Sequence, residues 1–283
     1  AHLSAGEQLS ANHEMVMQQM LGLMAVIPSM NSGCIPEVCC GNVDSTAYYE
    51  HANQYGACKC GKARIGCEYK SECGALARFS CPDGRIGYDS GKDCRYFGQH
   101  LHVVTVCNKK CGVDLPVSFT LADAQRHDAV VFPVLYQEMS YSIPTFHMDY
   151  FAGDSAYDHP PIYDFLLSEG TIPLIALNTS SMTYKELPKG FRISAKGYPI
   201  CPAKKEMAFV GNDEEDKCWL YACPMKPGTA EVCSHKEKCP CCINGPEALR
   251  INPKDSSRFF TVIPRDCDEF KDNMGGRSAS ERV

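Results

Sequence analysis

The spacing of hydrophobic residues divides the chain into predicted helices and strands separated by two irregular stretches. Residues 8–30 repeat apolar residues at helical spacing and predict a helix. Its methionine-rich stripe, which includes Met15, Met20 and Met24, is expected to fill space in the core. Residues 42–49, NVDSTAYY, then predict a short strand.

Regular patterns resume after residue 95. The segments 96–106 and 115–122 alternate well enough to predict two strands joined as a hairpin, and a helix is expected to begin near Asp128. Between the first strand and the hairpin, residues 52–95 lose periodicity and are rich in Cys, Gly and basic residues. They are therefore predicted to form an insertion loop.

A strand, turn, helix and strand follow one another in residues 145–178. TFHMDYFAG predicts a half-buried strand that stops at Gly153, immediately before Asp154. Pro160 suits the first turn of a helix that Gly170 ends, and the apolar run IPLIAL predicts a buried strand. Open α/β sheets place their chemistry where a carboxylate ends the first strand of such a unit. The simpler alternative is that Asp154 only caps a helix.

The pattern breaks again in the last third of the chain. Residues 179–262 are predicted to be a second cysteine-rich insertion, although FFTVIP at its end can form a strand. Residues 263–283 predict the start of a polar helix that carries Glu281. The predicted organisation is an N-terminal helical segment (1–40), a core that contains the first insertion (41–178), the second insertion and the terminal helix.

Cysteine usage and targeting signals limit the class of protein. The 283-residue chain has 19 cysteines, an odd number that excludes complete internal disulfide pairing. The first 54 residues contain no Lys or Arg, so no signal peptide is predicted, and no apolar run approaches the roughly 18 residues that span a bilayer. Reduced thiols or metal ligands are expected. Because the chain begins without Met and stops inside a predicted helix, it is expected to be a fragment.

Charge is distributed unevenly along the chain, whose net charge is −6. Residues 55–111 contain ten Lys and Arg against five Asp and Glu, whereas residues 112–170 contain one against nine. The acidic surroundings of Asp154 favour a cation. The basic stretch can follow a phosphate backbone, or it can be an ordinary solvated loop.

Three carboxylates are candidate catalytic residues, namely Asp44, Asp154 and Glu281. An acidic residue inside a short strand, as Asp44 is, is unfavourable unless it has a partner or a role. The hairpin and helix between the first two acids are expected to make their strands neighbours. Carboxylate oxygens hold Mg²⁺ or Mn²⁺. Two such ions, about 3.5 to 4 Å apart, can activate a water or a 3′-hydroxyl and stabilise the leaving oxygen of a phosphoryl transfer.

Cysteines of the second insertion form a candidate structural zinc site. They are Cys218, Cys223, Cys233, Cys239, Cys241 and Cys242, with His235 nearby. They supply enough soft ligands for one tetrahedral Zn²⁺, but no clean pair of CxxC repeats occurs, so ordinary reduced thiols are the alternative. Elsewhere, Asp128 is expected to cap the middle helix or to favour its dipole, and His127 is expected to be structural rather than close to a metal.

Several motifs together resemble the DDE catalytic domain of bacterial insertion-sequence transposases, the broad group that includes the Tn5-like enzymes. NVDST resembles the first-aspartate strand, GDSAYDHPPIYDFLLSEGTIPLIALN the second-aspartate motif and RSASERV the closing helix. RIGYDSGKDCRYFGQHLHVV and SFTLADAQRHDAVVFPVL resemble the stretches between the two aspartates. The resemblance covers roughly residues 40–283, and GDSAYD and the spacing from Arg277 to Glu281 are its most specific parts.

This resemblance implies an α/β fold of the RNase H-like type, a mixed β-sheet flanked by helices, with cysteine-rich insertions. It implies that Asp44, Asp154 and Glu281 bind two Mg²⁺ or Mn²⁺ ions. It also implies that Arg277, one helical turn before the glutamate, contacts a DNA phosphate or a flipped base. The chain departs from the family in two places, because Met274 stands where Tyr is usual and a matching Lys would fall beyond Val283.

The function that the resemblance implies is DNA transposition. Such an enzyme cuts double-stranded DNA at the terminal repeats of an element and joins the freed 3′-hydroxyl to target DNA. The resemblance further implies a bacterial cytoplasmic protein that acts as a homodimer on DNA, with no membrane partner. Two alternatives stay open: a truncated, catalytically inactive remnant that binds DNA or zinc, and an RNase H-like nuclease without strand transfer.

Overall fold

The computed structural model describes residues 10–52, 81, 83–178, 191–194, 197–223, 248–252 and 257–278. These residues form two compact units. Unit 1 consists of the described residues of Ala1–Glu37 and Val43–His147, and unit 2 of those of Val38–Asn42 and Met148–Ala279. Strand β1 (Cys40–Tyr49) therefore begins in unit 2 and continues into unit 1.

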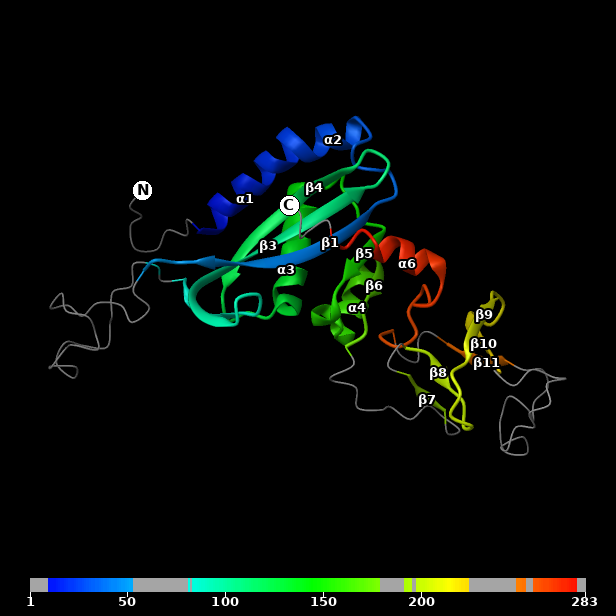
Figure 1. Ribbon diagram of the computed structural model, residues 1–283. Helices are drawn as coiled ribbons and strands as arrows, with labels where there is room; N and C mark the ends of the chain where they lie inside the picture. Colours follow the sequence, from blue (N-terminus) through cyan, green and yellow to red (C-terminus); the bar gives the residue numbers. More distant parts are fainter. Residues whose placement is uncertain are drawn as a thin grey trace, which may run out of the picture. The chain divides into compact units, whose positions relative to one another are not determined.

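Unit 1 is built on a long β-hairpin (Figure 1). The hairpin strands are β3 (Cys94–Asn108) and β4 (Val113–Asp123), and the shorter strand β2 (Arg85–Asp89) precedes them. β3 pairs antiparallel with β4 over most of its length and with β2 at its beginning. Val104, Val106 and Val117 are fully or almost fully buried, as expected for the apolar face of alternating strands. The predicted hairpin is confirmed, and both strands extend beyond the segments that alternation had predicted.

Helices pack against strand β4 of this hairpin. They are α1 (Ser10–Leu21), the π-helical turn η1 (Gly22–Val26) and α3 (Asp128–Ser142), and the short helix α2 (Ile27–Asn31) packs on η1. α1 and α3 contact β4 and also each other (Figure 1). The predicted helices near residues 8–30 and after Asp128 are therefore confirmed, although the first one is interrupted by the π turn.

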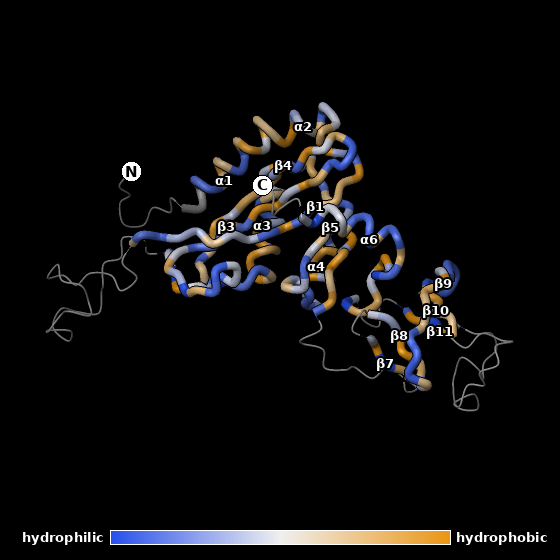
Figure 2. The backbone as a smooth tube through the Cα atoms, in the orientation of Figure 1, coloured by the Kyte–Doolittle hydropathy of each residue, from blue (hydrophilic) through white to orange (hydrophobic). Residues whose placement is uncertain are grey.

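The predicted burial of the methionine stripe is wrong. Met15, Met17, Met20 and Met24 are 37 to 74% exposed, and hydrophobic residues recur all along this helical segment (Figure 2). The buried face instead carries positions 18, 22 and 26, which are four residues apart. Gln18 is 1% exposed because its side-chain oxygen accepts a hydrogen bond from Ser118 Oγ (3.1 Å) and its amide donates to the Phe119 carbonyl. A polar residue that finds partners on the sheet thus decides which face is buried.

The core of unit 2 is a parallel strand, helix and strand unit. Its elements are β5 (Tyr150–Gly153), the 3-10 turn η3 (Ser155–Tyr157), α4 (Pro160–Ser168) and β6 (Ile172–Ile175). β5 pairs in parallel with β6 on one side and with the first residues of β1 on the other. α4 buries Ile162, Tyr163 and Leu166, and Gly170, at φ +79°, lies in the turn that follows it. The predicted order of this segment is confirmed, and β5 ends at Gly153 as predicted, but both strands are shorter than the predicted segments 145–153 and 172–177.

Antiparallel and parallel pairings combine in one large sheet. Its strand order is β2-β3-β1-β5-β6, and β4 also pairs with β3. The hairpin strands are antiparallel, whereas β1, β5 and β6 run in parallel. The chain is thus an α/β protein with a mixed sheet flanked by helices, which is compatible with the predicted RNase H-like fold.

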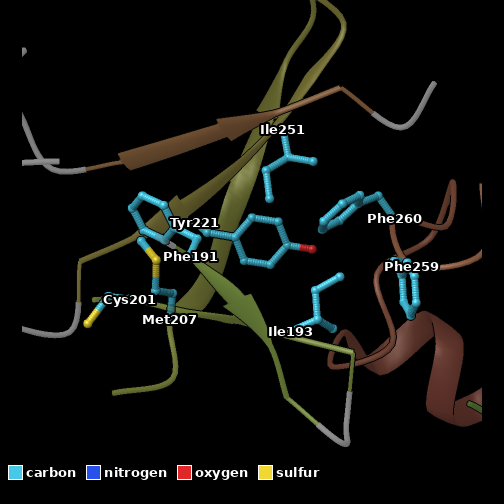
Figure 3. Close-up of a cluster of buried hydrophobic side chains, with 8 residues drawn as sticks. All are labelled: Phe191, Ile193, Cys201, Met207, Tyr221, Ile251, Phe259 and Phe260. Atoms are coloured by element: carbon cyan, nitrogen blue, oxygen red, sulfur yellow. The ribbon is translucent and has the colours of Figure 1, made fainter. Parts of the chain in front are cut away.

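Unit 2 also holds two small sheets within the predicted second insertion. They are formed by β7 (Arg192–Ile193) with β8 (Pro199–Ile200), and by β9 (Ala208–Asp213), β10 (Cys218–Ala222) and β11 (Ala248–Ile251). A hydrophobic cluster lies between them (Figure 3). Its members are Phe191, Ile193, Cys201, Met207, Tyr221, Ile251, Phe259 and Phe260. The described part of the insertion therefore has a core of its own.

The strand predicted for FFTVIP does not form. Phe259 and Phe260 both belong to the buried cluster, whereas a regular strand would point successive side chains to opposite faces. The next residue, Thr261, accepts a hydrogen bond from the indole N–H of Trp219 (2.8 Å) through its carbonyl oxygen. The segment therefore packs as an irregular turn against β10.

The last helix, α6 (Asp268–Met274), is shorter than predicted. Asp268 and Glu269 in its first turn favour the helix dipole. Two glycines, Gly275 and Gly276, follow directly, and glycine is about 1 kcal/mol less favourable than alanine inside a helix. None of the described helices combines the length and hydropathy needed to cross a membrane.

A buried ion pair links distant parts of unit 2. The carboxylate of Asp158, which has no exposed side-chain surface, accepts two hydrogen bonds from Arg258, at 3.0 Å from Nε and 2.8 Å from Nη2. The same carboxylate accepts hydrogen bonds from the Tyr163 hydroxyl (2.9 Å) and the Asn178 backbone N–H (2.6 Å). Such a bidentate, fully bonded pair is expensive to disrupt on one side only, because an unpaired charge would stay buried.

We expect Arg258→Met to lower the free energy of unfolding by about 3 to 5 kcal/mol, because it leaves the Asp158 carboxylate buried without its counter-ion. Urea denaturation followed by circular dichroism measures the change. Arg250→Met is the matched control: Arg250 contacts Asp213 and Asp216 at 2.6 Å but is 55% exposed, so its loss should cost less than about 1 kcal/mol. Equal effects of the two substitutions would contradict the assigned role of the buried pair.

None of the cysteines in the described part of the chain forms a disulfide. They are Cys34, Cys39, Cys40, Cys81, Cys94, Cys107, Cys111, Cys201, Cys218, Cys223 and Cys267. Their environments differ, because Cys39 is 1% exposed and Cys111 lies on the surface. Burial raises the pKa of the Cys39 thiol to about 12.

We expect iodoacetamide at pH 8 to modify Cys111 and to leave Cys39 unmodified in the folded protein. The thiolate is the nucleophile, and with a pKa of about 12 only about one Cys39 in 10,000 is a thiolate at this pH. Peptide mass spectrometry of a labelling time course measures both rates, and a urea-unfolded sample is the control in which both residues should react. Equal labelling in the folded protein would show that Cys39 is not protected.

Candidate functional site

Asp154 stands where strand β5 ends. Its side chain is half-buried, and its Oδ1 accepts a hydrogen bond from the backbone N–H of Ala156 (2.8 Å). Asp154 thereby caps the 3-10 turn η3, not α4, whose N-cap residue is His159. The capping alternative is thus correct for the turn, but it uses only one of the two carboxylate oxygens. Capping and metal binding are therefore compatible roles for this residue.

Asp44 lies in the middle of strand β1. It is half-buried, and its Oδ1 accepts a hydrogen bond from the Ser45 backbone N–H (2.9 Å). The Ser45 hydroxyl donates in turn to Oδ1 of Asp128 (3.1 Å), the first residue of α3. Asp44 is therefore next to a residue that links β1 with the start of a helix.

The pairing of β1 with β5 defines the backbone register near both aspartates. Within unit 2, Asn42 pairs with Ala152 in a parallel ladder, and neither residue has exposed surface. Asp44 follows Asn42 by two residues, and Asp154 follows Ala152 by two residues. Side chains two residues apart in an extended strand point to the same face.

The structure describes Arg277 but not Glu281. Arg277 lies in a turn, where its backbone N–H donates to the Met274 carbonyl (3.0 Å). Helix α6 ends before Arg277, so the predicted position of Arg277 inside the terminal helix is wrong. The physical reason is the pair of glycines that follows α6, because glycine is unfavourable inside a helix. Glu281 lies outside the described residues.

The predicted zinc ligands are only partly described. Cys218 begins strand β10 and Cys223 follows its last residue, and the four steps from residue 218 to 222 span about 13 Å of extended chain. Sulfur ligands lie about 2.3 Å from a zinc ion, so one tetrahedral ion does not take both thiols while β10 is intact. Cys233, Cys239, Cys241, Cys242 and His235 lie outside the described residues.

Another group of side chains that could hold a metal ion occurs in unit 1, and sequence reasoning missed it. His100, His102 and Asp128 each place one ligand atom within 4.8 Å of the others. Burial lowers the pKa of His102 to about 4, against a smaller opposing effect of Asp128, so its imidazole is neutral at neutral pH. The spacing of the two histidines on one strand was a visible signal, because residues i and i+2 share a face. Their proximity to Asp128 depends on tertiary packing.

The start of α3 bears out the structural role predicted for His127 and one of the two roles predicted for Asp128. His127 is the N-cap residue, and its Nδ1 accepts a hydrogen bond from the Ala129 backbone N–H (3.3 Å). The predicted structural role of His127 is confirmed. Asp128 is the first helical residue rather than the cap, so its carboxylate favours the helix dipole and is directed to Ser45.

Comparison with known protein families gives one match. The family described as transposase DDE domain matches residues 60–213, which is more than half of the 283-residue chain. The matched region contains Asp154 and the His100, His102 and Asp128 group, begins after Asp44 and ends before Arg277. No curated protein and no solved structure matched the chain. On its sequence match and its mixed sheet flanked by helices, the chain belongs to the transposase DDE domain family.

Proposed function

We propose that this protein cuts DNA at the ends of a mobile element and transfers the freed 3′ end to target DNA. Membership of the transposase family supports a nucleic-acid-processing enzyme. The observation that carries the proposal is the parallel pairing of Asn42 with Ala152, because the chain continues from each of these residues to an aspartate two positions later. Partners in a parallel ladder share a face, so this register favours a joint role of Asp44 and Asp154.

Carboxylates fit the divalent ions that this chemistry requires. Asp44, Asp154 and Glu281 would hold Mg²⁺ or Mn²⁺, since hard cations prefer oxygen ligands. Asp44 and Asp154 are half-buried, so both solvent and a DNA phosphate could reach an ion bound by them. Two such ions would supply activation of the attacking hydroxyl and stabilisation of the leaving oxygen.

The residues of the chain itself orient the carboxylates and bind DNA. Backbone N–H groups of Ser45 and Ala156 each hold one oxygen of the neighbouring aspartate, which fixes the direction of the other oxygen. Arg277 would donate hydrogen bonds to a DNA phosphate. The excess of Lys and Arg in residues 55–111 would attract the phosphate backbone of double-stranded DNA.

Two further features belong to the same proposal. An element has two terminal repeats, so a homodimer on DNA is the expected assembly, with each protomer engaging one end. A structural Zn²⁺ held by thiols of residues 218–242 would stabilise the second insertion, with either Cys218 or Cys223 among the ligands but not both.

We expect Asp154→Asn to abolish cleavage of supercoiled plasmid DNA in Mn²⁺ or Mg²⁺ and to weaken Mn²⁺ binding by about 10- to 100-fold or more, because it removes one anionic ligand. Gel electrophoresis measures nicking, and isothermal titration calorimetry measures Mn²⁺ binding. Asp164→Asn is the matched control, because Asp164 is an exposed acid on α4 that accepts a hydrogen bond from Ser257 (2.9 Å). This control should retain both properties.

The outcomes separate the alternatives. Mn²⁺ binding without cleavage by the wild-type protein would indicate an inactive remnant. Cleavage without joining of a labelled 3′-hydroxyl oligonucleotide to the plasmid would indicate a nuclease without strand transfer. Nicking that persists unchanged in Asp154→Asn would refute the catalytic role of this aspartate.

A further inference from the structure

Strand β3 and helix α3 bring two imidazoles and one carboxylate together inside unit 1. His100 and His102 are two residues apart on β3, so both side chains point to one face of the strand. Asp128 opens α3, and its Oδ1 lies 3.8 Å from Nδ1 of His102. One ligand atom from each of the three residues lies within 4.8 Å of the other two.

These separations are close to those of ligands around one ion. Nitrogen and oxygen ligands lie about 2.0 to 2.2 Å from zinc, which puts the ligand atoms of a tetrahedral site roughly 3.3 to 3.6 Å apart. The distance between His102 Nδ1 and Asp128 Oδ1 is only slightly longer than this. The other separations are at most 4.8 Å, so the three ligand atoms have to approach one another by no more than about 1.5 Å to share one ion.

The histidines lack other hydrogen-bond partners among the described residues. The side chain of His102 is 1% exposed, and neither of its ring nitrogens makes a hydrogen bond in this part of the chain. Nδ1 of His100 is also buried without such a bond. Buried polar atoms are nearly always hydrogen-bonded, so three unsatisfied nitrogens in one place indicate a missing ligand. A metal ion coordinated by one nitrogen of each histidine gives a partner to both rings and leaves only the second nitrogen of His102 without one among the described residues.

The type of ligand determines the type of ion. Imidazole nitrogen suits Zn²⁺ and other late first-row ions, whereas Mg²⁺ is held by oxygen ligands. We propose that His100, His102 and Asp128 bind a structural Zn²⁺ ion that is separate from the ions of the carboxylate site. The ion links β3 to the start of α3. Through the hydrogen bond from Ser45 to Asp128 (3.1 Å), it also holds the part of β1 next to Asp44.

Zinc stoichiometry of the full chain tests the site. The protein is stripped with a chelator and dialysed against radioactive Zn²⁺ in excess Mg²⁺, which occupies the carboxylate site so that Zn²⁺ does not bind there. His100→Gln, His102→Gln and Asp128→Asn should each lose one equivalent of zinc relative to the wild type, or bind that equivalent at least about 10-fold more weakly. Thiol sites elsewhere in the chain contribute equally to all of these proteins and cancel in the comparison.

Two control variants make the result specific. His147→Gln changes an exposed histidine outside the cluster and should keep the full zinc stoichiometry. Asp154→Asn should also keep it, so that failure of the proposed zinc site and failure of the proposed catalytic site give different results. Unchanged stoichiometry in all three cluster variants would overturn the proposal.

A measurement on the wild-type protein covers the case in which a cluster variant does not fold. In protein labelled with ¹⁵N-histidine, addition of Zn²⁺ should shift imidazole nitrogen signals of His100 and His102 among the nine histidines of the chain. The signal missing from the spectrum of His100→Gln, which lies at a half-buried position, identifies the first of them. If neither histidine signal shifts after one equivalent of Zn²⁺ is added beyond the amount that the thiol sites bind, the zinc site does not exist.

Discussion

The parallel register between β1 and β5 is the constraint on which the candidate site depends. A slip of one residue would turn every side chain of a strand to the opposite face. Several contacts in unit 2 prevent this slip: the Cys39 N–H donates to Asp149 Oδ2 (2.9 Å), and the Tyr150 N–H donates to the Cys39 carbonyl (3.1 Å). Gly41 reinforces them, because an added Cβ there would collide with the side chain of Met148. The positions of Asp44 and Asp154 along their strands are therefore a consequence of close packing several residues earlier.

The segment after β5 depends on a second interaction, the buried pair of Asp158 and Arg258. Asp158 lies four residues beyond Asp154, and its carboxylate is bonded on all sides by Arg258, Tyr163 and Asn178. Arg265 extends the network, since it donates to the Tyr163 hydroxyl (2.9 Å) and to the Ile175 carbonyl at the end of β6 (3.1 Å). The irregular segment before α6 thus supplies the cations for the parallel unit.

Local sequence patterns were sufficient to predict the elements in which buried residues recur at a regular helical or strand spacing. The β3–β4 hairpin and the strand, helix and strand unit around Asp154 could be predicted because alternation and proline or glycine positions determine them. The buried face of α1 could not, because it depends on the bonds of Gln18 to a strand 100 residues away. The sequence marks Asp154 by its place after a strand. Nothing local marks Asp158, because its structural role depends on an arginine that is also 100 residues away. The His100, His102 and Asp128 group is intermediate, since only the spacing of its two histidines is local.

The excess of acidic residues in 112–170 has several physical causes, and only part of it concerns metal ions. Asp158 neutralises a buried arginine, Asp123 pairs with the exposed Arg126 (3.2 Å), and Asp149 accepts a backbone N–H. Of the remaining acids, Asp128 lies beside two imidazoles and Asp154 follows a strand that is paired with another aspartate-bearing strand. Nitrogen-rich and oxygen-only ligand sets select different ions at the same concentrations. A protein that contains both can therefore keep a structural ion and catalytic ions apart by ligand chemistry, even though Ser45, which directly follows Asp44, also contacts Asp128.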